Sequence, residues 1–140
     1  MEVEVVVEAE VRPTEDAEKV RRAINNIFEG EVRVEGNMAR LECRNLTCLT
    51  RFHLKLRQQR ILDTARSVLK KSTYGGYIEF MLNKQAAYTG KVSFVTDPSE
   101  SPMGPIQVLI RHPYPGEVID WLAPRTSHGK PVWEREMPSS

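Results

Sequence analysis

The sequence predicts a single α+β domain, built on a mainly antiparallel sheet with helices packed on one face. Stretches with β-branched residues at every second position alternate with stretches whose apolar residues recur at helical spacing. Several strand-like segments follow one another directly, which favours antiparallel pairing. A chain of 140 residues with 40% hydrophobic and 28% charged residues is ordinary for one globular domain.

The expected order of elements is β-α-β-β-α-α-β-β-β-α. In the first strand, residues 3–11, valine and alanine alternate with glutamate, so one face is buried and the other is acidic. These glutamates are typical of a solvated face or of edge protection. Pro13 ends the strand, and a helix over residues 15–29 is expected next, with Thr14 as its N-cap.

Residues 31–35 and 38–43 alternate again around a Gly-Asn turn and predict a hairpin. Residues 46–71 contain no glycine or proline and predict helix. The apolar stripe of the first half of this segment is rotated by about half a turn, at ~100° per residue, from that of the second half. Either two helices meet near Gln58, or one long helix is covered on different sides. We favour the break.

Shorter patterns predict the remaining elements, in the order strand 77–82, connection 83–90, strand 91–95, loop 96–105, strand 106–111 and short helix 117–122. The domain is expected to span residues 1–129. Prolines and a glycine predict an irregular tail over residues 130–140.

Charge is distributed unevenly along the chain, although the net charge is only +1. Residues 1–39 carry five basic and ten acidic side chains, whereas residues 40–91 carry eleven basic and three acidic ones. Residues 92–140 carry four basic and six acidic side chains. The neutral total therefore conceals a strongly basic central segment, and a local positive field attracts phosphate whatever the total.

The basic segment predicts an RNA-binding helical face in which cations neutralise phosphates. The expected phosphate-binding residues in its helical part are Arg57, Arg60, Arg66, Lys70 and Lys71. Tyr74, Tyr77 and Tyr88 can add base stacking if they are exposed. The alternative is a protein-interaction module, in which the same basic face docks an acidic partner or the acidic strand of a second copy.

No pattern predicts a catalytic, metal or cofactor site. The spacing of Cys43, Cys48 and His53 suits neither a zinc site nor a Cys–His pair on one helical face. The glutamates of residues 2–10 alternate along a strand instead of converging on a metal, and a glycine-rich phosphate loop is missing. With no signal-peptide pattern and no apolar run of membrane length, we expect a cytoplasmic protein, no membrane partner and two reduced thiols.

Five motifs resemble an archaeal protein family that is itself uncharacterised and is described as predicted RNA-binding or exosome-associated. They are RPTED at residues 12–16, RILDTAR at 60–66, NKQAAYTGKVSF at 83–94, MGPI at 103–106 and DWLAPRT at 120–126. The resemblance implies an α+β fold similar to the ribosomal protein that contacts 5S RNA. It also implies RNA and RNA-processing proteins as partners.

This resemblance adds Lys84, Gln85, Tyr88 and Lys91 to the candidate surface residues. The leading hypothesis is an RNA-binding protein without enzyme activity, in which Lys84 and Lys91 join the phosphate-binding residues and Tyr88 stacks on a base. A homodimer or another protein partner is the alternative.

Overall fold

In the computed structural model, which describes residues 2–139, seven strands form one sheet in the order β2-β3-β1-β7-β5-β4, and β6 also pairs with β5. Every pair within this sheet is antiparallel, as predicted. The strands are β1 (Glu4–Glu10), β2 (Val32–Glu35), β3 (Met38–Cys43), β4 (Thr73–Tyr74), β5 (Tyr77–Asn83), β6 (Phe94–Val95) and β7 (Pro105–Arg111).

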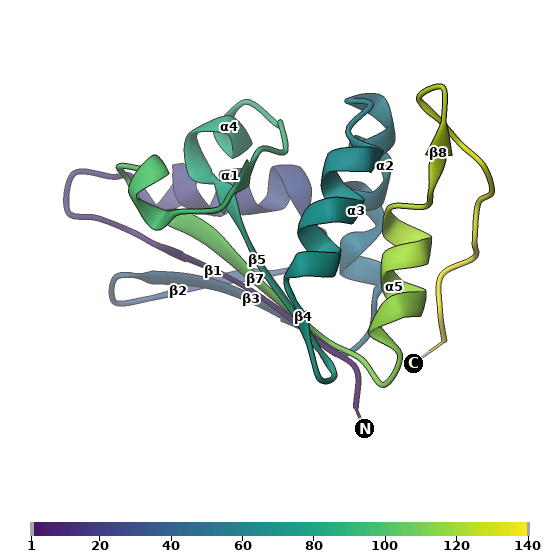
Figure 1. Ribbon diagram of the computed structural model, residues 1–140. Coiled ribbons are helices and arrows are strands. Elements are labelled where there is room, and N and C mark those ends of the chain that lie inside the picture. Colours follow the sequence, from purple (N-terminus) through teal and green to yellow (C-terminus); the bar gives the residue numbers. More distant parts are fainter. Residues whose placement is uncertain (1, 140) are drawn as a thin grey trace.

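Five α-helices lie on one side of the sheet, which leaves its other face open (Figure 1). They are α1 (Ala17–Ile27), α2 (Thr50–Gln58), α3 (Leu62–Lys71), α4 (Lys84–Tyr88) and α5 (Pro115–Leu122). Two 3₁₀-helices cover Thr47–Leu49 and Pro98–Glu100. The predicted α+β class, with helices packed on one face of an antiparallel sheet, is confirmed.

The core lies between the sheet and the helices. On the central strand β1, the side chains of Val5, Val7 and Ala9 are buried, as the period-two pattern predicts. Phe52 of α2 stacks between two other rings, with ring centroids 5.5 Å from Phe28 and 5.6 Å from Phe80. These aromatic contacts fix the helical layer on the sheet.

Two local predictions are confirmed. The β2–β3 hairpin turns at Gly36, whose φ of 60° suits a residue without a Cβ. The helical segment breaks after Gln58, where Arg60 takes a φ of 56° and α3 begins at Leu62. Helix α1 is shorter than predicted, because the side chain of Asp16, and not of Thr14, caps its first turn.

The acidic strand is not an edge strand, so the edge-protection interpretation is wrong. β1 pairs with β3 on one side and β7 on the other, and its glutamates lie on the open face. The edge on the β3 side of the sheet is β2, where the guanidinium of Arg21 donates to the carbonyl of Val32 at 2.6 Å. A helix side chain therefore covers part of the backbone that another strand would need.

The expectation of two reduced thiols is also wrong. Cys43 ends β3 and Cys48 lies in the 3₁₀-helix that follows, and the structure joins them by a disulfide. The tight turn between them brings their Cα atoms to 6.7 Å, within the range that a disulfide spans.

The chain after α5 returns along the helical layer. A two-stranded hairpin, β8 (Thr126–Ser127) and β9 (Lys130–Pro131), is followed by residues without regular secondary structure up to Ser139. The predicted irregular tail thus begins with the short strand β9. Within residues 2–139, no helix combines the length and apolar character that crossing a membrane needs.

Candidate nucleic-acid interface

The open face of the sheet carries both signs of charge. We use this name for the side of β1, β2, β3, β5 and β7 that points away from the helices. The strand registers place there the acidic residues Glu4, Glu8, Glu10, Glu35, Glu42 and Glu79, and the arginines Arg33, Arg40 and Arg111. Acidic side chains outnumber basic ones, so this face does not attract phosphate.

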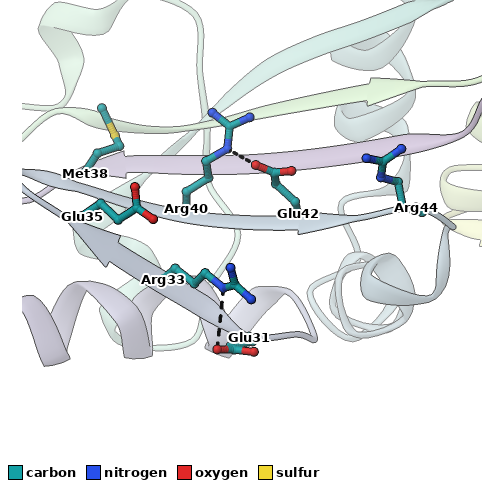
Figure 2. A pocket seen from close by; sticks show the side chains of 7 residues that line it. All are labelled: Glu31, Arg33, Glu35, Met38, Arg40, Glu42 and Arg44. Carbon is teal, nitrogen blue, oxygen red and sulfur yellow. Dashed lines mark hydrogen bonds and ion pairs between the residues drawn. The ribbon is translucent and has the colours of Figure 1, made fainter.

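The arginines of the open face are held by glutamates (Figure 2). Arg40 lies 2.8 Å from Glu8 and 2.5 Å from Glu42. Arg33 pairs with Glu31 at 3.8 Å. A cavity of about 690 Å³ runs between these side chains, but its lining alternates between arginine and glutamate. A phosphate there would have to displace a carboxylate that is already in place.

The helical side of the molecule holds the predicted phosphate-binding residues, but Arg57, Arg66 and Lys84 have structural roles. Arg57 pairs with Glu134 at 2.6 Å, and it also donates to the backbone carbonyls of Trp121 and Leu122. Arg66 pairs with Asp120 at 3.0 Å. Both arginine side chains are mostly buried, with exposed fractions of 17% and 15%. They fasten α5 to α2 and α3, so these two guanidinium groups are engaged within the protein and are not free for phosphate.

Lys84 is not a surface residue, and its prediction as one is wrong. Its side chain is fully buried, and its ammonium group lies 2.6 Å from the carbonyl of Glu10, 2.7 Å from that of Met103 and 3.0 Å from the carboxylate of Glu15. An ammonium group has three donors, so these three acceptors satisfy it. Lys84 therefore joins β1, the turn before α1, α4 and the loop before β7.

Four predicted cations remain on the surface: Arg60, Lys70, Lys71 and Lys91. Within residues 2–139, the structure gives their side chains no hydrogen-bond or ion-pair partner. The same is true of five exposed cations that sequence reasoning missed, which are Lys19, Arg22, Arg125, Lys130 and Arg135. Lys19 and Arg22 lie in residues 1–39, and the other three lie in residues 92–140. Both segments are net acidic, so a count of charge by segment does not indicate these cations.

Specific contacts bring several of these cations together. The side-chain amide of Gln59 donates to the backbone carbonyl of Val92 at 2.9 Å and accepts from the backbone N–H of Val92 at 2.7 Å. We call this pair of hydrogen bonds the Gln59 clamp. Because Arg60 follows Gln59 and Lys91 precedes Val92, these bonds join the two backbone segments that carry the two cations. Thr126 of β8 bonds to Asp63 of α3, which brings the hairpin to the start of that helix.

A second cavity, of about 370 Å³, lies between α3 and β8, and its lining includes Lys70, Arg125, Arg66 and the carboxylate of Asp63. We call Lys91, Arg60, Arg125 and Lys70 the basic track. Lys91 follows α4, Arg60 lies between α2 and α3, Lys70 lies in the last turn of α3, and Arg125 precedes β8. Lys71 lies apart, beside a cavity at the β4 edge of the sheet.

Gln85 and Tyr88 lie on α4, away from the basic track. They line a cavity of about 610 Å³ together with Thr14, Glu15, Asp16, Lys19, Arg22 and Met103. Gln85 is exposed, whereas Tyr88 is half-buried and its hydroxyl donates to Glu15 at 2.8 Å. Burial, and then this bond, raise the pKa of Tyr88. Burial alone would raise the pKa of Glu15, but hydrogen bonds from Arg12 N–H, Lys84 and Tyr88 hold it below its usual value.

Comparison with known proteins identifies the family. The model of a protein family described as RNA binding matches residues 4–112. The chain belongs to this family. The RNA-binding family match contains Arg60, Lys70 and Lys91 of the basic track, and it ends before Arg125.

The relatives of this chain come from archaea. The UPF0201 protein of Sulfurisphaera tokodaii is 49% identical over 140 residues, which cover 96% of this chain and 97% of that protein. The UPF0201 protein of Aeropyrum pernix is 52% identical, with 97% and 95% covered. The crystal structure of a UPF0201 protein from Methanococcus jannaschii is similar with a TM-score of 0.81 at 36% identity, covering 92% and 98% of the two chains.

Proposed function

We propose that this protein binds RNA without catalysing a reaction on it, and that the basic track holds the phosphate backbone. One observation carries the proposal. The exposed cations of the track have no internal partner among residues 2–139, whereas the open-face arginines are paired with glutamates. Phosphate binding at the track would displace no carboxylate and would release counterions from the RNA.

Membership of a family described as RNA binding supports the same class of ligand. The earlier resemblance to exosome-associated proteins and to the 5S-RNA-contacting ribosomal protein remains a prediction. So do the cytoplasmic location and the association with RNA-processing proteins. These finer predictions add partners and do not alter the expected phosphate contacts.

Salt-dependent binding tests this proposal. Affinity for a single-stranded 12-mer RNA is measured by fluorescence anisotropy from 50 to 200 mM salt. Replacing Arg60→Gln and Lys91→Gln together removes two phosphate contacts, so the slope of log affinity against log salt should fall by about 1.4. Near 0.1 M salt the affinity should fall by roughly tenfold to thirtyfold.

The matched control is Arg33→Gln, an arginine on the open face whose side chain is 75% exposed. It should leave both affinity and slope close to those of the unmodified protein. Absence of binding at 50 mM salt would contradict the proposal, and so would an equal loss of affinity in the control.

The alternative function is a homodimer, in which the basic track of one copy docks on the acidic open face of another. The arrangement of the two charges on opposite sides of the molecule favours it over strand pairing, since β1 is central and β2 is partly covered by Arg21. In that case the Arg60→Gln and Lys91→Gln variant should elute as a smaller species on sizing chromatography. An unchanged elution volume counts against the dimer.

A further inference from the structure

The cavity beside α4 is a second feature of the helical side, distinct from the basic track. Its walls come from the turn before α1, from α1 itself, from α4 and from the loop before β7. Its volume of about 610 Å³ falls within the ~300–1,000 Å³ of ordinary small-molecule sites. It is therefore large enough for one nucleobase with its ribose.

The floor of this cavity is rigidly built. The side chain of Glu15 is 4% exposed and accepts from both the buried Lys84 and the hydroxyl of Tyr88. Lys84 also holds the carbonyl of Met103, which fixes the loop on the other wall. The orientation of the Tyr88 ring is thus set before any ligand arrives, and a preorganised ring loses little entropy on binding.

The lining combines the three kinds of group that recognise an unstacked base. The half-buried ring of Tyr88 offers a stacking surface, and the exposed amide of Gln85 offers both a donor and an acceptor. Lys19 and Arg22 are exposed at the rim and have no partner within residues 2–139, so they can receive the phosphates on either side of that base.

We propose that this cavity takes one unstacked base of a single-stranded RNA whose backbone continues onto the basic track. The inference rests on the proposed function and deepens it, because it names single-stranded RNA as the ligand class. A base within an A-form duplex is stacked and paired, so it cannot enter such a cavity.

The test compares two ligands with the same backbone. One is a single-stranded RNA 12-mer, and the other is a 12-mer of ribose phosphate that lacks its bases. The unmodified protein should bind the complete RNA about fivefold to tenfold more tightly, the gain expected from stacking one base. Gln85→Ala and Tyr88→Ala should each bring this ratio towards one while leaving affinity for the base-free chain unchanged.

The controls separate the two proposals. Gln107→Ala removes an exposed glutamine from the open face and should keep the full ratio. Tyr88→Phe keeps the ring if Tyr88→Ala fails to fold, and it should retain most of the ratio. Equal binding of both ligands by the unmodified protein would overturn the base site alone. Failure to bind either ligand at 50 mM salt would overturn RNA binding itself.

Discussion

The open face and the basic track both expose cations, and they differ in how those charges are matched. Arg40 on the open face lies within 2.8 Å of one glutamate and 2.5 Å of another. Arg60 on the track is exposed and has no such neighbour among residues 2–139. A paired guanidinium already has its acceptors, whereas an unpaired one is solvated by water that a phosphate can replace. Pairing, and not the number of cations, distinguishes the two surfaces.

The helical side contains the same contrast within one motif, because Lys84 is buried and Lys91 is exposed. Lys84→Met would leave the carboxylate of Glu15 buried without its cation, so the free energy of unfolding should fall by about 3–5 kcal/mol. Lys91→Met should change it by at most ~0.5 kcal/mol. Urea unfolding at pH 7 measures both variants.

The double variant Lys84→Met with Glu15→Gln isolates the charge. It removes the buried carboxylate along with the lysine, so it should recover part of the lost stability. If Lys84→Met alone were as stable as the unmodified protein, the assignment of Lys84 to a structural role would be wrong.

The different roles of Lys84 and Lys91 mark the limit of what the sequence can predict. Local patterns sufficed for the long strands β1, β2, β3, β5 and β7, for the hairpin at Gly36 and for the break after Gln58, but they missed the short strands β4, β8 and β9. The burial of Lys84 depends on Glu15, which is 69 residues away in the chain. No local pattern encodes such a pair, and a buried lysine and an exposed one look the same in a charge count.

The candidate site was predicted only in part, for the same physical reason. Arg60 was identified because it lies in the helical part of the basic segment, and Lys91 because it lies in a motif that resembles the archaeal family. Arg57 was wrongly included because its partner, Glu134, lies in the tail. Arg125 was missed because the bond between Thr126 and Asp63 that brings it to the track joins distant segments. Tertiary contacts decide which cations are free.

The contacts around Arg57 also affect His53, and they predict how the stability of the protein depends on pH. His53 stacks on Trp121 with ring centroids 5.0 Å apart. Burial, and then repulsion by Arg57, lower the pKa of His53 from 6.5 to about 4, although Glu134 acts in the opposite direction. His53 is therefore neutral in the folded protein at pH 7.

Between those two pKa values the unfolded chain binds the proton that the folded chain rejects. Stability should therefore fall as pH drops from about 6.5 to about 4, by ~1–3 kcal/mol. His53→Phe keeps a ring against Trp121 and cannot titrate, so its urea stability should change less over this window. If the stability of the two proteins depended on pH in the same way, His53 would not be the group responsible. The RNA-binding slope against salt should be the same in both at pH 7, since His53 is then uncharged.

The smallest expected effect comes from a substitution that converts a paired arginine of the open face into an unpaired one. It tests directly whether pairing distinguishes this face from the basic track. Glu8→Gln with Glu42→Gln removes both carboxylates from Arg40. If pairing is what keeps the open face from binding phosphate, RNA affinity near 0.1 M salt should rise by about twofold to fivefold. The salt slope should increase by about 0.7, one additional phosphate contact.

The matched control removes the same charge without freeing an arginine. Glu10 and Glu35 are exposed on the open face and have no ion-pair partner within residues 2–139, so Glu10→Gln with Glu35→Gln changes the net charge equally. An equal gain in both double variants would mean that the overall field of the face, and not the pairing of Arg40, excludes RNA. No gain in either would mean that even a free arginine on a flat sheet cannot hold the backbone. RNA binding would then require several unpaired cations held together, as the Gln59 clamp and the β8 hairpin hold those of the basic track.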